Sequence, residues 1–233
     1  MYELLIEFLL RVLDIDVEVV KKCETIHPII ISNHISELDP ALLFYVLKNE
    51  NIRYIAGVED IKKIPLFNAI CEHFKVIFIE RDKSKAYDAM TQQLNGTSPT
   101  VCIFPEGTLF FKSSIERSDA YCDKMGIRKF KNVLAPREAG FSKLQELLGK
   151  QQSKYTDITL IYDVDMRPSE TPLTIIEILK LRPKRVQIII DETDLSISDA
   201  FRIKDDLIET QRNIPQRLSI REVFRTVFRV PFV

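Results

Sequence analysis

The stretch PIIISNHISELDPALLFYVL, residues 28–47, carries the pattern from which the fold of this chain can be inferred. Three consecutive isoleucines after a proline are typical of a short strand that is buried on both faces. Asp39 followed by Pro40 is typical of a helix start, with Asp39 as the N-cap, and the apolar run beyond it continues as helix. The stretch therefore predicts a strand, a polar turn and a helix, with His34 in the turn and Asp39 at its end.

Further strand-like and helix-like segments alternate along the 233 residues. The strand-like segments are IRYIAG, KVIFIE, TVCIF, DITLIYDV and RVQIIID, and the helical segments are PALLFYVLK, IPLFNAICEHF and SKAYDAMTQQL. Strands separated by helical segments of about ten residues indicate an α/β layer with much parallel pairing. No linker rich in Gly, Pro or Ser divides the chain. We therefore predict a single α/β domain with a mixed, largely parallel sheet flanked by helices.

The composition excludes several classes of protein. The formal net charge of −1 provides no basic field for nucleic acid, so no nucleic-acid partner is expected. The cysteines at positions 23, 71, 102 and 122 form no CxxC pair and lie mostly in apolar surroundings. We expect buried free thiols there, not disulfides or a zinc site. No run of about 18 apolar residues is free of charge, so no membrane-spanning helix is expected.

Both ends of the chain are amphipathic. In MYELLIEFLLRVLDI the charges recur at helical spacing, which predicts a helix with a narrow polar stripe and a Glu7–Arg11 pair. We assign residues 1–20 to this helix and residues 21–233 to the main domain. The helix would pack on the core or lie in a bilayer interface, and its sequence suits both. The tail SIREVFRTVFRVPFV suits a bilayer surface and a solvated arginine face over packed phenylalanines equally.

Three groups of polar residues follow predicted strands. His34 and Asp39 come after the first strand, and only a turn would bring them together, since five residues of helix would set them about 140° apart. Arg81 ends a strand, where a guanidinium suits a phosphate. The turn 106–108 follows TVCIF, and Gly107 lets its backbone approach a ligand. Parallel strands present their carboxyl ends at one sheet edge, so we expect the three groups to lie together.

The segments NHISELD, VIFIER and FPEGT, in this order and spacing, resemble the signatures of the glycerolipid acyltransferase family, which are NHxxxxD, an arginine-terminated strand and FPEGT. RSDAY, residues 117–121, and VLAPREAGF, residues 133–141, are similar to the lysocardiolipin and lysophosphatidylinositol branch of the 1-acylglycerol-3-phosphate acyltransferases. The resemblance covers roughly residues 28–195 and implies a glycerol-3-phosphate acyltransferase-like fold. Leu109 stands where many members carry arginine, which disfavours plain lysophosphatidic acid as the acceptor.

The resemblance implies transfer of an acyl group from acyl-CoA to the free hydroxyl of a lysophospholipid without a covalent acyl-enzyme. The acceptor would be of the 1-acylglycerol-3-phosphate, lysophosphatidylinositol or lysocardiolipin type, in phospholipid synthesis or remodelling. His34 would act as the general base and Asp39 would orient its ring. The residues that would contact the acceptor, with Arg81 on its phosphate, are Asn33, Arg81, Glu106, Gly107 and Thr108. Pro136 and Arg137 would line the acyl or CoA channel.

No resident cofactor is expected, because acyl-CoA is a co-substrate and His34 and Asp39 lack further ligands at metal-binding spacing. Ser32 and Ser36 flank the histidine without a G-x-S-x-G elbow, so no serine nucleophile is expected. By family resemblance, we expect a membrane-associated enzyme on a cytosolic face, that of the endoplasmic reticulum, which reaches lipid through its amphipathic ends. Protein partners are not indicated.

Three alternative functions stay open at this point. The chain would be a glycerol-3-phosphate acyltransferase, a CoA-independent transacylase, or a catalytically silent lipid-binding protein that kept the fold. The last alternative is disfavoured by the intact His34, Asp39, Arg81 and Glu106, because a protein that only binds lipid needs no base.

Overall fold

The structure is a computed structural model. It describes residues 6–7, 10–12, 14–48, 51–57, 71, 75–80, 82–148, 153–163, 170–181 and 183–213. The strands in this part of the chain are β1 (Asp16–Lys21), β2 (Ile29–Ser32), β3 (Ile52–Gly57), β4 (Ile77–Ile79), β5 (Thr100–Ile103), β6 (Tyr155–Tyr162) and β7 (Arg185–Thr193). The helices are α2 (Asp39–Leu47), α5 (Lys83–Leu94), α6 (Lys112–Met125), α7 (Glu138–Leu148), α8 (Ile175–Leu181) and α9 (Ile197–Asn213).

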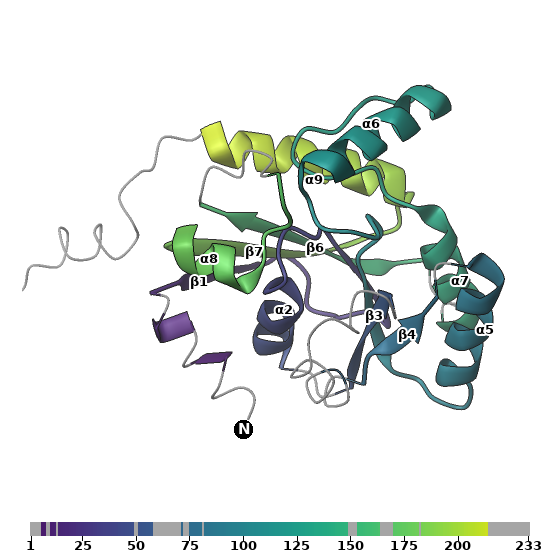
Figure 1. The fold of residues 1–233 in the computed structure, drawn as a ribbon. Helices are drawn as coiled ribbons and strands as arrows, with labels where there is room; N and C mark the ends of the chain where they lie inside the picture. The colour runs from purple at the N-terminus through teal and green to yellow at the C-terminus, as the bar shows by residue number, and fades with distance from the viewer. Residues whose placement is uncertain are drawn as a thin grey trace, which may run out of the picture.

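The strands form one seven-stranded sheet in the order β1-β7-β6-β2-β5-β3-β4. Every pairing is parallel except that of β6 with β7, which is antiparallel. Figure 1 shows α9 on one side of this sheet and α2 on the other. The predicted single α/β domain with a mixed, largely parallel sheet is confirmed. β2 lies at the centre, so the loop that follows it opens at the middle of the sheet.

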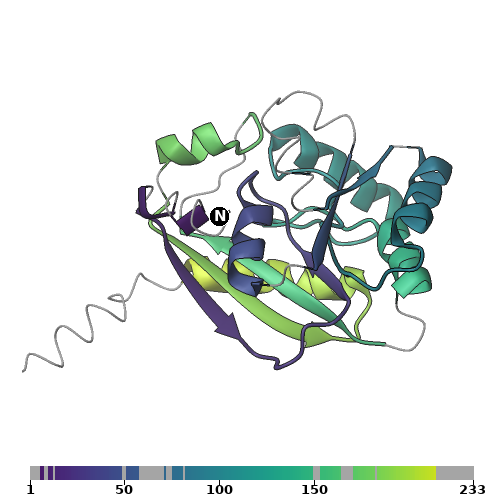
Figure 2. The same ribbon diagram turned by 90° about the horizontal axis from the view of Figure 1, so that it is seen from below.

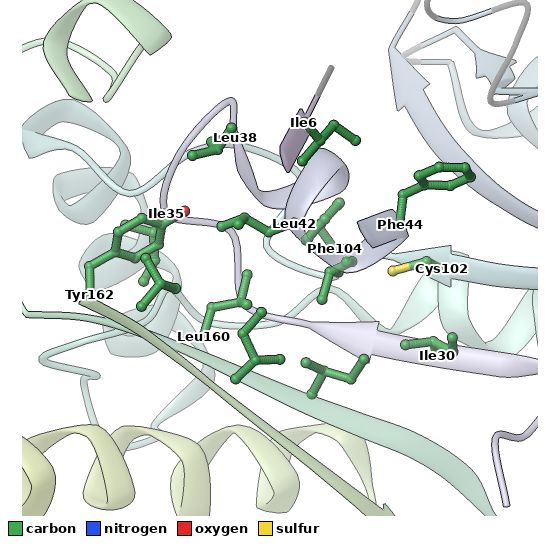
Figure 3. Close-up of a cluster of buried hydrophobic side chains, with 14 of the residues drawn as sticks. Ile6, Ile30, Ile35, Leu38, Leu42, Phe44, Cys102, Phe104, Leu160 and Tyr162 are labelled. Atoms are coloured by element: carbon green, nitrogen blue, oxygen red, sulfur yellow. The ribbon is translucent and has the colours of Figure 1, made fainter. Parts of the chain in front are cut away.

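The isoleucines of β2 explain why this strand is central. Ile30 faces the α2 side of the sheet, whereas Ile29 and Ile31 face the opposite side, and all three are buried. A strand that is apolar on both faces needs a covering layer on each. Figure 3 shows the cluster on the α2 side, with Ile30 and Leu160 on the strands beneath Leu42 of α2. In Figure 2, seen from below, α2 lies in front of the strands and α9 behind them.

The assignment of residues 1–20 to a helix is wrong at its C-terminal end. Residues 16–21 form β1, which pairs in parallel with β7 at the edge of the sheet. Asp14 adopts a positive φ of 54°, which ends the helical conformation before β1 begins. The valines of DVEVVK favour a strand once β7 offers a partner. The predicted Glu7–Arg11 pair is confirmed, with 2.7 Å between the guanidinium and the carboxylate.

The described part of the N-terminal segment packs on the core. Ile6 and Leu10 are buried in the cluster on the α2 side, while Val12 is 63% exposed. These positions favour core packing over a bilayer interface for this part of the segment. The rest of its apolar face, the predicted helix 64–74 apart from Cys71, and the tail 219–233 lie outside the described residues. Among the helices that the structure describes, none has the length and hydropathy needed to cross a bilayer.

Candidate active site

Asn33 fixes the loop that leaves β2. Its side-chain amide donates to the Leu160 carbonyl at 2.9 Å, and its side-chain oxygen accepts the Leu160 N–H at 2.8 Å. The side chain is fully buried and continues the pairing of β2 with β6. This residue orients the loop, because both of its polar groups are used by a backbone 127 residues away. The expected contact of Asn33 with the acceptor stays a prediction.

The turn after β2 brings the imidazole of His34 and the carboxylate of Asp39 together. His34 Nδ1 lies 3.0 Å from Asp39 Oδ2. A carboxylate only accepts, so the Nδ1–H donates, and in the neutral ring Nε2 carries the lone pair. Among the described residues Nε2 has no hydrogen-bond partner, and the His34 side chain is 20% exposed. Its ring stacks on Phe104 with 4.1 Å between centroids, which fixes the ring plane.

Five donors converge on the buried carboxylate of Asp39. Besides the imidazole, Oδ2 accepts the backbone N–H groups of Ile35 at 2.6 Å and Ser36 at 2.8 Å. Oδ1 accepts the hydroxyls of Ser36 at 3.0 Å and of Tyr162 at 2.6 Å. This set fixes the carboxylate in position and orientation, so the imidazole that it holds is fixed as well.

The prediction that Asp39 caps the following helix is wrong. Asp39 is the first residue of α2, the N-cap is Leu38, and no side chain caps this end. Pro40 lies in the first turn, as predicted. The carboxylate turns back to the preceding loop because the amides of that loop and the imidazole offer it three donors. Asp39 thus orders the loop that carries His34.

Tyr162, at the end of β6, is a residue of this site that sequence reasoning missed. Burial and the neighbouring Asp39 carboxylate hold the pKa of its phenol well above its usual range, so it remains a donor at neutral pH. Ser36 Oγ lies 2.8 Å from the phenol oxygen, but each hydroxyl has one proton, so the two are not joined by a hydrogen bond while both donate to Asp39. The available signal was a tyrosine at the carboxyl end of a strand, the edge of the sheet where the other polar groups had been expected.

Glu106 joins two loops from inside the protein. Its Oε2 accepts the backbone N–H of His34 at 2.7 Å, and its Oε1 accepts that of Leu134 at 3.1 Å. Burial raises the pKa of this carboxyl to about 8, against the two backbone donors, which lower it. The carboxyl group points inward and positions the backbone of His34, and the expected contact of Glu106 with the acceptor stays a prediction.

The rest of the FPEGT turn wraps around the same loop. Gly107 adopts a φ of 68°, and its N–H donates to the Phe104 carbonyl at 3.0 Å. This amide closes the turn, so it is not available to a phosphate or an oxyanion. Further along, the Phe110 N–H donates to the His34 carbonyl at 3.1 Å. Thr108 is partly exposed, and its contact with the acceptor stays a prediction.

The segment VLAPR lies against the FPEGT turn. The Arg137 N–H donates to the Pro105 carbonyl at 2.8 Å. The Ala135 N–H donates at 2.8 Å to the hydroxyl of Ser118, which is buried in α6. Pro136 is buried and Arg137 is exposed. The structure therefore brings these two residues beside the site, and their place in an acyl or CoA channel stays a prediction.

Two other expectations concern reactive groups. Arg81 lies outside the described residues, so its contact with a phosphate stays a prediction.

The cysteines at 23, 71, 102 and 122 are free and buried, as predicted, and burial raises the pKa of each thiol. Such thiols are poor nucleophiles towards a thioester. Within the described ranges, no three or more His, Cys, Asp or Glu side chains are grouped to hold a metal ion.

Curated proteins of two kinds are similar to this chain. Lysocardiolipin acyltransferase 1 of Mus musculus is 30% identical over 155 residues, which are 62% of this chain and 41% of that protein. The probable 1-acyl-sn-glycerol-3-phosphate acyltransferase 5 of Arabidopsis thaliana is 27% identical over 203 residues, which are 77% of this chain and 52% of that protein. The chain thus spans about half, or less, of the length of these relatives.

A solved structure and a family model complete the comparison. The crystal structure of the 1-acyl-sn-glycerophosphate (LPA) acyltransferase PlsC from Thermotoga maritima superposes with a TM-score of 0.54 at 16% identity, covering 94% of this chain and 80% of that one. This likeness supports the fold alone. The family model described as Acyltransferase matches residues 15–160, more than half of the chain. The order of its motifs and this match agree, and the chain belongs to the acyltransferase family.

Proposed function

We propose that the chain is an acyl-CoA-dependent O-acyltransferase that moves a fatty acyl group to the free hydroxyl of a lysophospholipid. The observation that carries the proposal is the pair of His34 and Asp39, in which a buried carboxylate with five donors orients a partly exposed imidazole. The relatives named for lysocardiolipin and for 1-acyl-sn-glycerol-3-phosphate support a lysophospholipid as the acceptor.

The first step is attack of the acceptor hydroxyl on the thioester carbonyl carbon. An alcohol is a weak nucleophile at neutral pH, so a base has to take its proton as the new C–O bond forms. His34 Nε2 takes that proton, because Nδ1 is committed to Asp39. The carboxylate of Asp39 stabilises the imidazolium that results, and the carbonyl oxygen becomes an oxyanion.

The second step is collapse of the tetrahedral intermediate. The C–S bond breaks, the thiolate of CoA leaves, and the proton on Nε2 passes to the sulfur. His34 returns to its neutral form, and the products are the new ester and free CoA. Direct transfer is supported by the burial of the cysteine thiols and by the use of Ser36 in the hydrogen-bond set of Asp39.

The substrates and the place of the reaction extend the proposal. Arg81 binds the acceptor phosphate, Thr108 contacts the acceptor, and Pro136 and Arg137 lie along the acyl or CoA channel. The acceptor is of the 1-acylglycerol-3-phosphate, lysophosphatidylinositol or lysocardiolipin type, in phospholipid synthesis or remodelling. The enzyme works at a membrane surface, on the cytosolic face of the endoplasmic reticulum. No resident cofactor or metal takes part.

The experiment uses purified protein in detergent, labelled oleoyl-CoA and a panel of lysophospholipids together with glycerol 3-phosphate. We expect His34→Ala to lose roughly 10²–10⁴ in rate, because a general base contributes about that much. The matched control is His27→Gln, since His27 pairs with Glu192 away from the site. A folded His34→Ala variant with wild-type turnover would refute the mechanism.

The same panel separates the alternatives. Acylation of glycerol 3-phosphate in preference to lysophospholipids would identify a glycerol-3-phosphate acyltransferase. Transfer from a phospholipid without CoA would identify a transacylase. Lipid binding without any transfer would leave a silent binding protein.

A further inference from the structure

Helix α6 separates its charged side chains onto two sides. At 3.6 residues per turn, Arg117, Tyr121 and Lys124 fall within about 60° of one another. The acidic residues of the helix, Glu116, Asp119 and Asp123, fall on another side, about 140° away. Ser118 and its buried neighbours form a third side, which faces the core. One side of α6 is therefore basic and aromatic, without a carboxylate of the helix itself.

Aromatic rings lie beneath the guanidinium groups on this basic side. The guanidinium carbon of Arg137 is 4.1 Å from the centroid of the Tyr121 ring, and that of Arg117 is 5.9 Å from the Phe111 ring. Arg117 and Tyr121 are neighbours one helical turn apart. Phe111, Arg117, Tyr121 and Arg137 therefore form one continuous feature, which we call the arginine–aromatic row. A guanidinium is attracted to the face of a ring, more strongly at the 4.1 Å of Arg137 than at the 5.9 Å of Arg117.

The two guanidinium groups are not neutralised within the described part of the chain. Arg117 and Arg137 are exposed, and neither forms an ion pair with a described carboxylate, not even with Glu138 beside Arg137. Two lysines of this region are paired, Lys112 with Glu170 and Lys129 with Asp123. An exposed guanidinium without a carboxylate presents its N–H donors in the geometry that matches phosphate oxygens.

Short hydrogen bonds tie this row to the loop of the catalytic base. The Arg137 N–H is bonded to Pro105 of the FPEGT turn, and Ser118, next to Arg117, is bonded to Ala135. Phe110, which precedes the row, donates its N–H to the carbonyl of His34. The row is thus part of the same rigid assembly as the base. An anion held on it would keep a fixed relation to the imidazole.

We propose that the arginine–aromatic row binds the phosphate groups of a substrate. This inference rests on the proposed function, and it adds where the anionic part of a substrate is held. Acyl-CoA carries a pyrophosphate and a 3′-phosphate, and a lysophospholipid carries a headgroup phosphate, so both offer the same chemistry. The proposal also gives a role to RSDAY: Arg117 binds, Ser118 anchors the neighbouring segment, and Tyr121 supports Arg137.

The test measures binding without turnover, on Arg117→Gln, Arg137→Gln and the control Lys129→Gln. Lys129 carries the same charge but pairs with the acidic side of α6. One arm titrates CoA and dephospho-CoA, and the other sediments protein with phosphatidylcholine vesicles that contain or lack phosphatidylinositol. We expect each arginine variant to lose about tenfold in affinity in one arm, or about 1.4 kcal/mol. Lys129→Gln should match the wild type in both arms.

The arms also identify the source of the phosphate. A loss confined to CoA assigns the row to the donor, and a loss confined to phosphatidylinositol vesicles assigns it to a lipid headgroup. Wild-type affinity of both folded arginine variants in both arms overturns the proposal, as does a wild-type protein that binds neither ligand. Where a glutamine variant does not fold, Arg137→Lys replaces it, because it keeps the charge and loses the stacking on Tyr121. Unchanged affinity of that variant overturns the proposal too.

Failure of this inference is distinguishable from failure of the proposed function. A wild-type protein that binds CoA or vesicles through the row, and yet transfers no acyl group, refutes the function and leaves the site standing. An active enzyme whose arginine variants bind like the wild type refutes the site and leaves the function standing.

Discussion

Replacing Tyr162 by phenylalanine removes one hydroxyl from the donors around Asp39 and keeps the buried ring. Oδ1 of Asp39 accepts from Tyr162 at 2.6 Å and from Ser36 at 3.0 Å, so the variant leaves a buried carboxylate oxygen with one donor. A hydrogen bond to a charged group contributes about 1.5–3 kcal/mol. If that amount is lost from the transition state, kcat/KM falls roughly 10- to 150-fold.

Unfolding measurements distinguish a catalytic effect from a general loss of stability. With one donor fewer, the Asp39 carboxylate is held less firmly, and so is the imidazole that it orients. The fall in kcat/KM should therefore exceed that of a control variant that loses a hydrogen bond elsewhere. The assay is acyl transfer from labelled oleoyl-CoA, together with urea unfolding of the same protein.

Tyr155→Phe is the matched control for this experiment. Tyr155 lies on the same strand, is equally buried, and donates its phenol to the Leu195 carbonyl at 2.9 Å, away from Asp39. Both variants should lose free energy of unfolding, Tyr155→Phe about 0.5–1.5 kcal/mol because its acceptor is neutral. Only Tyr162→Phe should change the kinetics. If both variants keep wild-type kcat/KM, Tyr162 only stabilises the fold and our reasoning about Asp39 is wrong.

Three further outcomes are expected. Glu106→Gln places an NH₂ group opposite one of two backbone N–H donors, so urea unfolding should show a loss of about 1–3 kcal/mol that Glu116→Gln, an exposed control, does not share. Burial raises the pKa of Glu106 from 4.5 to about 8, so the folded state binds more protons than the unfolded state between these pH values. The free energy of unfolding should therefore fall as pH rises through this range, and Glu106→Gln should make that fall smaller. Arg81→Ala should raise the KM for the acceptor far more than that for acyl-CoA, and a rise confined to acyl-CoA would move Arg81 to the donor.

The sequence predicted the pair of His34 and Asp39 because all that joins them is local. Five residues, a strand before and a helix after suffice to require a turn between them. The sheet was predictable for the same reason, since its apolar strands and the helices between them are each a local pattern. β1 was not, because a short segment with three valines becomes a strand only when a distant strand, β7, lies beside it.

The direction of polar side chains was the part that sequence could not supply. Asn33 and Glu106 were expected to face a substrate, and both turn inward to backbone groups of Leu160 and Leu134. Tyr162 was missed because its partner Asp39 lies 123 residues away. Hydrogen bonds across such separations depend on how the strands pack, and no periodicity in one segment records them.

The backbone of His34 has a consequence for attempts to exchange parts between family members. Its N–H is bonded to Glu106, 72 residues later in the chain, and its carbonyl accepts the N–H of Phe110. Both backbone groups of His34 are therefore bonded to the FPEGT turn and the residues just after it. The two segments therefore behave as one transplantable unit. A chimaera that takes NHISELD from a donor sequence should also take FPEGT, together with the Leu134 segment that completes the pairing of Glu106. Recombination between the two motifs would instead combine an NHISELD loop and an FPEGT turn from different proteins, in which these hydrogen bonds need not match.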